Sequence, residues 1–121
     1  MGKKVLIADD EPNIVVSLDF LMEQQGFDVR VARDGDEVLA LVQSFEPDLV
    51  LLDVAMPAKS GYEVAQRIRE DPARSHVKII MLSARGRDTE ISKGLALGAD
   101  LYVTKPFSTR ELVAQVRTLL G

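Results

Sequence analysis

Short, mostly apolar runs alternate with longer segments of helical periodicity along the whole chain. The runs are Val5–Ala8, Val29–Ala32, Leu49–Leu52, Val77–Leu82 and Leu101–Val103. Runs of this kind are typical of strands that are buried on both faces, as in a parallel sheet with helices on each side. The pattern therefore predicts a parallel sheet between two helical layers.

The segments that follow these runs have apolar residues at the spacing of amphipathic helices. The apolar positions are Ile14, Val15, Leu18, Leu21 and Met22; Val38, Leu41, Val42 and Phe45; Val64, Ala65 and Ile68; Ile91 and Leu95; and Leu112, Val113, Val116, Leu119 and Leu120. The fourth segment, around Thr89 to Leu97, has the fewest apolar residues, so we expect a loosely held, mobile helix there.

Strand and helix alternate five times, which predicts an α/β fold of the (βα)5 type. Because crossovers between parallel strands are right-handed, the expected architecture is a doubly wound three-layer sandwich. The expected sheet order is 2-1-3-4-5, the flavodoxin-like arrangement. The length of 121 residues fits one domain, and no linker or repeat interrupts the pattern, so we expect a single domain over residues 1–121.

Composition narrows the possible functions. The chain has no cysteine, which excludes a disulfide framework, a thiolate metal site and a thiol nucleophile. Its formal net charge of −4 argues against nucleic-acid binding over the whole surface. No apolar run approaches the roughly 20 residues that span a bilayer, and the start "MGKK" lacks the apolar region of a signal peptide. We therefore expect a cytoplasmic protein without a membrane partner.

Polar residues follow four of the five predicted strands. In doubly wound sheets, ligands bind beyond the carboxyl ends of the strands, near the point where the strand order reverses. The residues at those ends are Asp9 and Asp10 after the first strand, Asp53 after the third, Ser83 after the fourth, and Thr104 and Lys105 after the fifth. The second strand ends at Ala32 and Arg33 and is expected at the sheet edge. The acids, the hydroxyl and the lysine should therefore converge on one pocket.

Taken singly, Asp9 and Asp10 could cap a helix, and Asp53 could be an ordinary loop acid. Together they form a costly group, because two carboxylates about 4 Å apart repel by about 4 kcal/mol at an effective dielectric near 20. A cation would relieve this repulsion, and hard oxygen ligands with room for water favour Mg²⁺. A carboxylate, a hydroxyl and a lysine around such a metal suit phosphoryl transfer to Asp53.

Four stretches, in this order and at this spacing, resemble the receiver domain of two-component response regulators, the CheY-like superfamily. They are "VLIADDEPN", "DLVLLDVAMPAKSG", "IIMLSA" and "GADLYVTKPF". The resemblance implies that Asp53 is the phosphoacceptor and that Asp10, Asp53 and the backbone carbonyl of Ala55 bind Mg²⁺, with Asp9 acting through water. It also implies that Ser83 and Tyr102 are switch residues, that Lys105 contacts the phosphoryl group, and that the Lys105–Pro106 bond is cis.

The function implied by the resemblance is a phosphorylation-dependent signalling switch, not an enzyme acting on other substrates. Its partners would be a sensor histidine kinase or a histidine phosphotransfer protein, and an output protein that binds the face of the fourth helix, fifth strand and fifth helix. Leu101 and Gln115 replace the Asp and Arg that form a charge-paired dimer in one branch of the family. We therefore expect a monomer.

Two alternatives fit the sequence less well. An aspartate-nucleophile phosphatase would have a second acid two residues after the nucleophile, where this chain has Ala55. A flavin-binding electron carrier would have a phosphate-binding loop after the first strand, where the acidic "DDEPN" would repel an anion. His76 and the basic residues between Arg67 and Arg87 are expected to be solvated surface.

Overall fold

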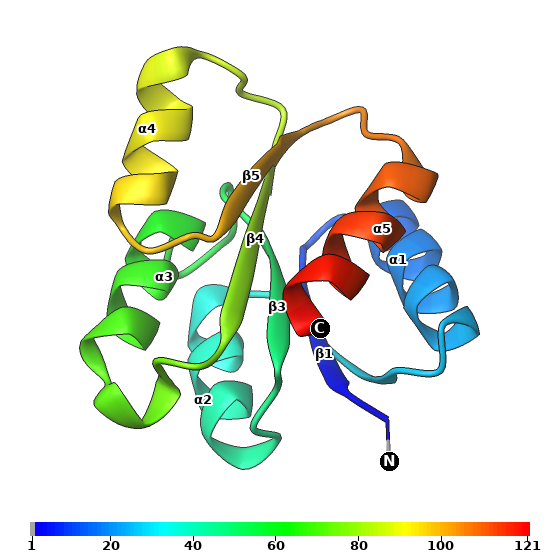
Figure 1. The fold of residues 1–121 in the computed structure, drawn as a ribbon. Helices are drawn as coiled ribbons and strands as arrows, with labels where there is room; N and C mark the ends of the chain where they lie inside the picture. Colours follow the sequence, from blue (N-terminus) through cyan, green and yellow to red (C-terminus); the bar gives the residue numbers. More distant parts are fainter. Residues whose placement is uncertain (1) are drawn as a thin grey trace.

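The structure is a computed structural model that describes residues 2–121, and it contains one parallel sheet between two helical layers (Figure 1). The strands are β1 (Lys4–Ala8), β2 (Asp28–Ala32), β3 (Leu49–Asp53), β4 (Lys78–Ser83) and β5 (Leu101–Thr104). They lie in the order β2-β1-β3-β4-β5, and all neighbours are parallel. The predicted fold class and strand order are therefore confirmed, with strand boundaries that differ by about one residue.

Helices α1 and α5 cover one face of the sheet, and α2, α3 and α4 cover the other (Figure 1). Their bounds are α1 Pro12–Gln24, α2 Gly35–Ser44, α3 Gly61–Glu70, α4 Asp88–Ala96 and α5 Thr109–Leu120, and a short 3-10 helix spans Pro72–Arg74. Among residues 2–121, no helix is long and apolar enough to cross a membrane.

The sheet separates two apolar cores, because successive side chains of a strand point to opposite faces. Leu6 and Ala8 of β1 lie in the core under α2 and α3, whereas Val5 and Ile7 lie in the core under α1 and α5. All residues of β3 are buried, which explains its continuous apolar run. Edge strand β2 is partly exposed, which explains the charged residues within it.

Helix starts are fixed by side-chain caps at three places. The side chains of Asp34, Ser60 and Ser108 accept hydrogen bonds from the backbone N–H groups of Glu37, Glu63 and Glu111, at 2.8, 3.3 and 3.3 Å. Helix α4 lacks such a cap, and of its residues, all of which the structure describes, only Gly94 is buried. This agrees with the low apolar content of its sequence and leaves α4 with few apolar contacts.

Shortening a side chain on the buried face of α1 should lower the stability of the fold much more than shortening one on the exposed face. Leu18 is 1% exposed in the core between α1 and the sheet, whereas Phe20 on the same helix is 64% exposed. We predict that Leu18→Ala lowers the free energy of unfolding by about 3 kcal/mol, through lost burial and a cavity. Phe20→Ala, the matched control, should change it by about 0.5 kcal/mol or less. Urea unfolding measures both, and equal losses would contradict the predicted packing.

Candidate functional site

The carboxyl ends of β1, β3, β4 and β5 meet at a polar pocket of about 300 Å³. It lies beside the switch point between β1 and β3, where doubly wound sheets bind ligands. The residues that line it are Asp10, Glu11, Asp53, Val54, Ala55, Ser83, Ala84, Arg85 and Lys105. The structure thus brings together the acids, the serine and the lysine that the sequence placed at one mouth, whereas Thr104 does not line this pocket.

Asp9 lies beneath the pocket and is fully buried. Its Oδ1 accepts a hydrogen bond from the Glu11 N–H at 2.9 Å, and its Oδ2 accepts one from Lys105 Nζ at 3.2 Å. Asp10 is exposed at the mouth. Helix α1 begins at Pro12, and its N-cap residue, Glu11, makes no side-chain cap, so helix capping does not explain the two adjacent aspartates.

Asp53 and Lys105 form the centre of the site. Lys105 Nζ lies 3.5 Å from Asp53 Oδ1, so the ammonium group bridges Asp53 and Asp9. Asp53 Oδ1 also accepts a hydrogen bond from the Ala55 N–H at 3.3 Å. One carboxylate oxygen from each of Asp9, Asp10 and Asp53 lies within 4.8 Å of the others. Three carboxylates therefore share a small volume with one neutralising lysine.

The charges of this cluster change the proton affinity of its members. Burial, followed by repulsion from Asp9, raises the pKa of Asp53 to about 6, although Lys105 opposes the shift. Burial disfavours the ammonium form of Lys105, but the carboxylates of Asp53 and Asp9 outweigh this effect and raise its pKa. The lysine therefore stays charged, while the ionised form of Asp53 is disfavoured.

The loop after Asp53 is held by backbone contacts. The Gly61 N–H donates to the Val54 carbonyl at 2.8 Å, and a Cβ at Gly61 would lie only 2.5 Å from the carbonyl oxygen of Asp53. The Pro57 carbonyl accepts hydrogen bonds from Gly35 at 3.1 Å and Lys59 at 2.8 Å. An ion pair between Lys59 and Asp36 adds a side-chain contact. The start of α2 thus supports the loop that contains Ala55.

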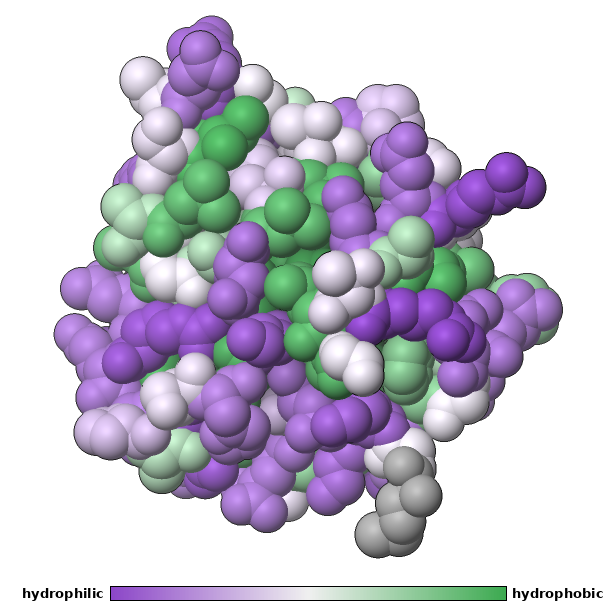
Figure 2. Space-filling view, in the orientation of Figure 1, coloured by the Kyte–Doolittle hydropathy of each residue, from purple (hydrophilic) through white to green (hydrophobic). Residues whose placement is uncertain are grey.

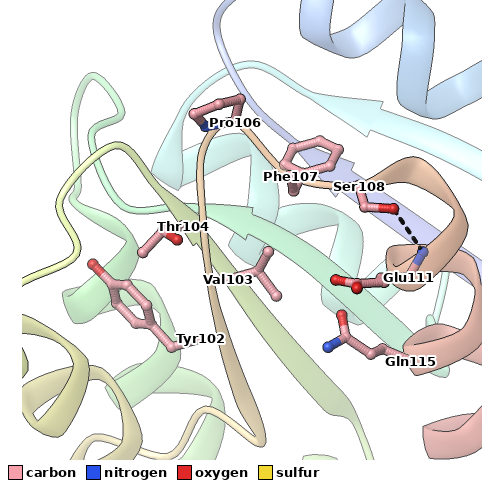
Figure 3. A pocket seen from close by; sticks show the side chains of 8 residues that line it. All are labelled: Tyr102, Val103, Thr104, Pro106, Phe107, Ser108, Glu111 and Gln115. Atoms are coloured by element: carbon pink, nitrogen blue, oxygen red, sulfur yellow. Dashed lines mark hydrogen bonds between the residues drawn. The ribbon is translucent and has the colours of Figure 1, made fainter.

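Ser83 and Tyr102 contact opposite backbone groups of the same residue, Arg85. Ser83 Oγ accepts a hydrogen bond from the Arg85 N–H at 3.0 Å, and the Tyr102 hydroxyl donates to the Arg85 carbonyl at 2.8 Å. Tyr102 and Thr104 project from the α4 side of β5, and Val103 projects toward α5 (Figure 3). The loop between β4 and α4 therefore links the serine in the pocket to the tyrosine on β5.

Three of the basic residues between Arg67 and Arg87 are paired with acids. Arg67 pairs with Glu63, Arg69 with Asp100 and Arg74 with Glu46. His76 is exposed in the turn before β4. The expectation of a solvated surface is confirmed for Arg67 and His76 and is wrong for Arg69 and Arg74, whose side chains are largely buried beside their acidic partners.

The donor set of the pocket fits a hard divalent cation. Asp10 and Asp53 offer carboxylate oxygens, Asp9 lies close behind them, and Ala55 lines the same pocket. Few oxygen ligands with space for water match Mg²⁺ better than zinc, which prefers nitrogen and sulfur. The Lys105–Pro106 peptide bond is cis, as the sequence resemblance implied.

Several supporting residues could not be identified from the sequence. Gly35, Asp36 and Lys59 support the loop after Asp53, and Arg85 links Ser83 to Tyr102 through its backbone. The only available signals were a glycine after Asp34 and the position of Arg85, two residues after Ser83. Neither signal predicts a backbone hydrogen bond.

Known structures share this fold over nearly the whole chain. The BeF3-activated DrrB receiver domain is 34% identical, with a TM-score of 0.90 over 99% of this chain and 98% of that one. The Francisella response regulator 1452 receiver domain is also 34% identical, with a TM-score of 0.91 over 98% and 97%. The chemotaxis response regulator CheY4 of Vibrio cholerae is 28% identical, with a TM-score of 0.92 over 98% and 99%.

The sequence also matches the family described as the response regulator receiver domain, over residues 5–117. This range contains β2 to β5, all of β1 except Lys4, and the whole acidic pocket. Receiver domains are signalling domains of two-component systems, and they bind Mg²⁺ at an aspartate cluster such as Asp9, Asp10 and Asp53. The chain belongs to the response regulator receiver domain family.

Proposed function

We propose that this chain, as one receiver domain over residues 1–121, is a phosphorylation-dependent switch with Asp53 as its phosphoacceptor. The observation that carries the proposal is the buried Asp53 carboxylate at the end of β3, 3.5 Å from Lys105 Nζ and inside an acid cluster suited to Mg²⁺. The donor would be a histidine kinase or a histidine phosphotransfer protein.

In the proposed reaction, a carboxylate oxygen of Asp53 attacks the phosphorus atom of a phosphohistidine. The new O–P bond gives an aspartyl phosphate, the P–N bond breaks, and the imidazole nitrogen leaves with its electron pair and takes up a proton. A pKa of about 6 leaves Asp53 mostly ionised near pH 7.5, as a nucleophile requires. Lys105, already held by Asp9, balances the charge of the transferred group.

Mg²⁺, when bound by Asp10, Asp53 and the Ala55 carbonyl with Asp9 acting through water, supplies further neutralisation of the phosphoryl oxygens. The burial of Asp9 and the engagement of both its oxygens support this indirect role. The exposure of Asp10 at the mouth supports direct binding. The BeF3-activated form of the DrrB receiver domain supports beryllofluoride as a probe of the same site here.

The signal would leave the site through Ser83 and Tyr102. The Ser83 hydroxyl now accepts a bond from the Arg85 N–H, and it would donate to the dianionic phosphoryl group instead. Arg85 would shift with it, which would change the contact between its carbonyl and the Tyr102 hydroxyl. The face of α4, β5 and α5 would then present an altered surface to an output protein.

Removing the acceptor tests this function directly. We expect acetyl phosphate with Mg²⁺ to add the mass of one phosphoryl group to the native chain and none to Asp53→Ala. Beryllofluoride with Mg²⁺ should shift the NMR signals of Ser83 and Tyr102 together. Glu70→Gln, which removes an exposed acid on α3, is the control and should behave as the native chain does. Full phosphorylation of Asp53→Ala in intact-mass spectra would refute the assignment.

The raised pKa of Asp53 predicts a pH-dependent cost. Its folded-state pKa of about 6 exceeds the usual value, so the folded state binds the proton more tightly than the unfolded state does. Without metal, the contribution of Asp53 to stability should fall as the pH rises from about 4 to 6, by up to about 3 kcal/mol in total. Asp53→Asn should remove this penalty, so urea unfolding in EDTA should show a gain at pH 7.5 and almost none at pH 4. A gain of equal size at both values would contradict the assigned cause.

The exposed face of β5 and α5 is the surface through which two copies of the chain could form a dimer. A small apolar hollow there is lined by Leu101, Ala114, Gln115, Thr118 and Leu119. Figure 2 shows apolar surface along α4 and between α4 and α5, among hydrophilic side chains. Leu101 is itself partly buried against the α5 core, which limits what it can offer a second copy.

We predict that the beryllofluoride-activated chain stays mostly monomeric at micromolar concentration, because the apolar area here is small and Leu101 cannot form an ion pair. Light scattering coupled to size exclusion, with and without beryllofluoride, measures this. Leu101→Asp is the matched variant, and it should be a monomer under both conditions as well. An activation-dependent dimer that Leu101→Asp disrupts would show the prediction to be wrong.

A further inference from the structure

Two tyrosines, Tyr102 and Tyr62, hold helix α4 against the rest of the fold. Gly94 is its buried residue, and a Cβ there would lie 2.8 Å from Cδ2 of Tyr102 and 2.8 Å from Sδ of Met81. The glycine therefore lets the helix approach the Tyr102 ring closely. Leu95, the next residue on this helix, is 45% exposed and adds little buried contact.

The second tyrosine, Tyr62, comes from α3 and contacts the first turn of α4. Its hydroxyl donates a hydrogen bond to the backbone carbonyl of Glu90 at 3.3 Å. Nζ of Lys93 lies 4.5 Å from the centre of the Tyr62 ring, a cation–π contact with the next turn. Tyr62 packs on the same core as Tyr102. Two turns of α4 are thus attached to one side chain.

Tyr62 directly follows Gly61, whose N–H closes the loop after Asp53 on the Val54 carbonyl. Gly61 also lies against the backbone of Asp53 so closely that a Cβ would not fit. A rigid connection therefore runs from the backbone of Asp53, through the first residues of α3, to the first turn of α4. This connection reaches α4 without passing through Ser83 or the backbone of Arg85.

One buried group disfavours the position of α4 against the fold, which we call its docked state. Oε2 of Glu90 is buried and has no hydrogen-bond partner among the residues that the structure describes. A buried carboxylate oxygen without a partner disfavours the docked state, and moving the first turn outward would hydrate it. The Tyr62 hydrogen bond and the Lys93 contact favour docking. Burial, with the Tyr102 hydroxyl and the Glu90 carboxylate nearby, raises the pKa of Tyr62 to about 12, so its hydroxyl remains a donor.

We propose that Tyr62 is a latch on α4, a positioning residue whose hydroxyl opposes release of the first turn driven by hydration of Glu90. Its regulatory consequence rests on the proposed function, since a change at Asp53 would reach α4 through Gly61 and Tyr62 as well as through Tyr102. The helix then has two tyrosine contacts whose balance sets how easily the output face rearranges.

Amide hydrogen exchange of the free protein tests the latch without any phosphoryl donor. Tyr62→Phe keeps the ring, its packing and the Lys93 contact, and removes only the hydroxyl. We expect the amides of α4 to exchange about fivefold faster, the effect of one hydrogen bond, while those of α5 stay unchanged. Glu90→Gln should act in the opposite direction and slow α4 exchange by about twofold, because a neutral amide costs less to bury than a carboxylate.

The outcomes separate the latch from the proposed function. Native-like α4 exchange in Tyr62→Phe would overturn the latch, and so would equal acceleration in α5, which would indicate a general loss of stability. Beryllofluoride with Mg²⁺ is then added to both proteins. Faster α4 exchange in the native chain, with a smaller further increase in Tyr62→Phe, supports coupling through Tyr62. Absence of any response in the native chain would overturn the phosphoacceptor assignment, while the free-protein comparison would still decide the latch.

Discussion

The crowding of Asp9 and Asp53 around one lysine is the constraint on which the rest of the site depends. Lys105 reaches both carboxylates, at 3.2 and 3.5 Å, but one positive charge cannot offset three acids in a partly buried space. Burial, together with the remaining repulsion from Asp9, raises the pKa of Asp53. A site in this state gains from any ligand that brings positive charge, so the same acids that weaken the free fold suit the site to a divalent cation.

This arrangement requires the doubly wound topology. Asp9, Asp53, Ser83 and Lys105 are far apart in sequence, and they meet because β1, β3, β4 and β5 are neighbours that end at one edge. The sequence predicted this well, since the burial of each strand on two faces forces apolar runs that can be recognised without a structure. Strand β2 was correctly expected at the edge, because it ends at Ala32 and Arg33 without a small polar residue.

What the sequence could not predict are contacts made by backbone groups. Any residue type carries an N–H and a carbonyl, so nothing in the letters indicates that Arg85 joins Ser83 to Tyr102, or that Gly35 supports Pro57. The role of Tyr62 could not be predicted either, because its partner is also a backbone group. From the sequence, Tyr62 is a half-buried aromatic residue of an amphipathic helix, and only the structure shows that its hydroxyl donates to the Glu90 carbonyl of another helix.

The distribution of contacts separates a rigid part of the molecule from a part that can move. The strands around Asp53 are buried throughout, and the loop after it is closed by Gly61 and supported from α2, so a change in charge there has little room to be absorbed locally. Helix α4 buries only Gly94 of its described residues and retains an unpartnered buried oxygen on Glu90. The element with the fewest stabilising contacts changes position at the lowest free-energy cost, so we expect a change at the rigid site to displace α4. The low apolar content of that helix, visible in the sequence, would then serve the proposed switch, although it also weakens the packing of α4.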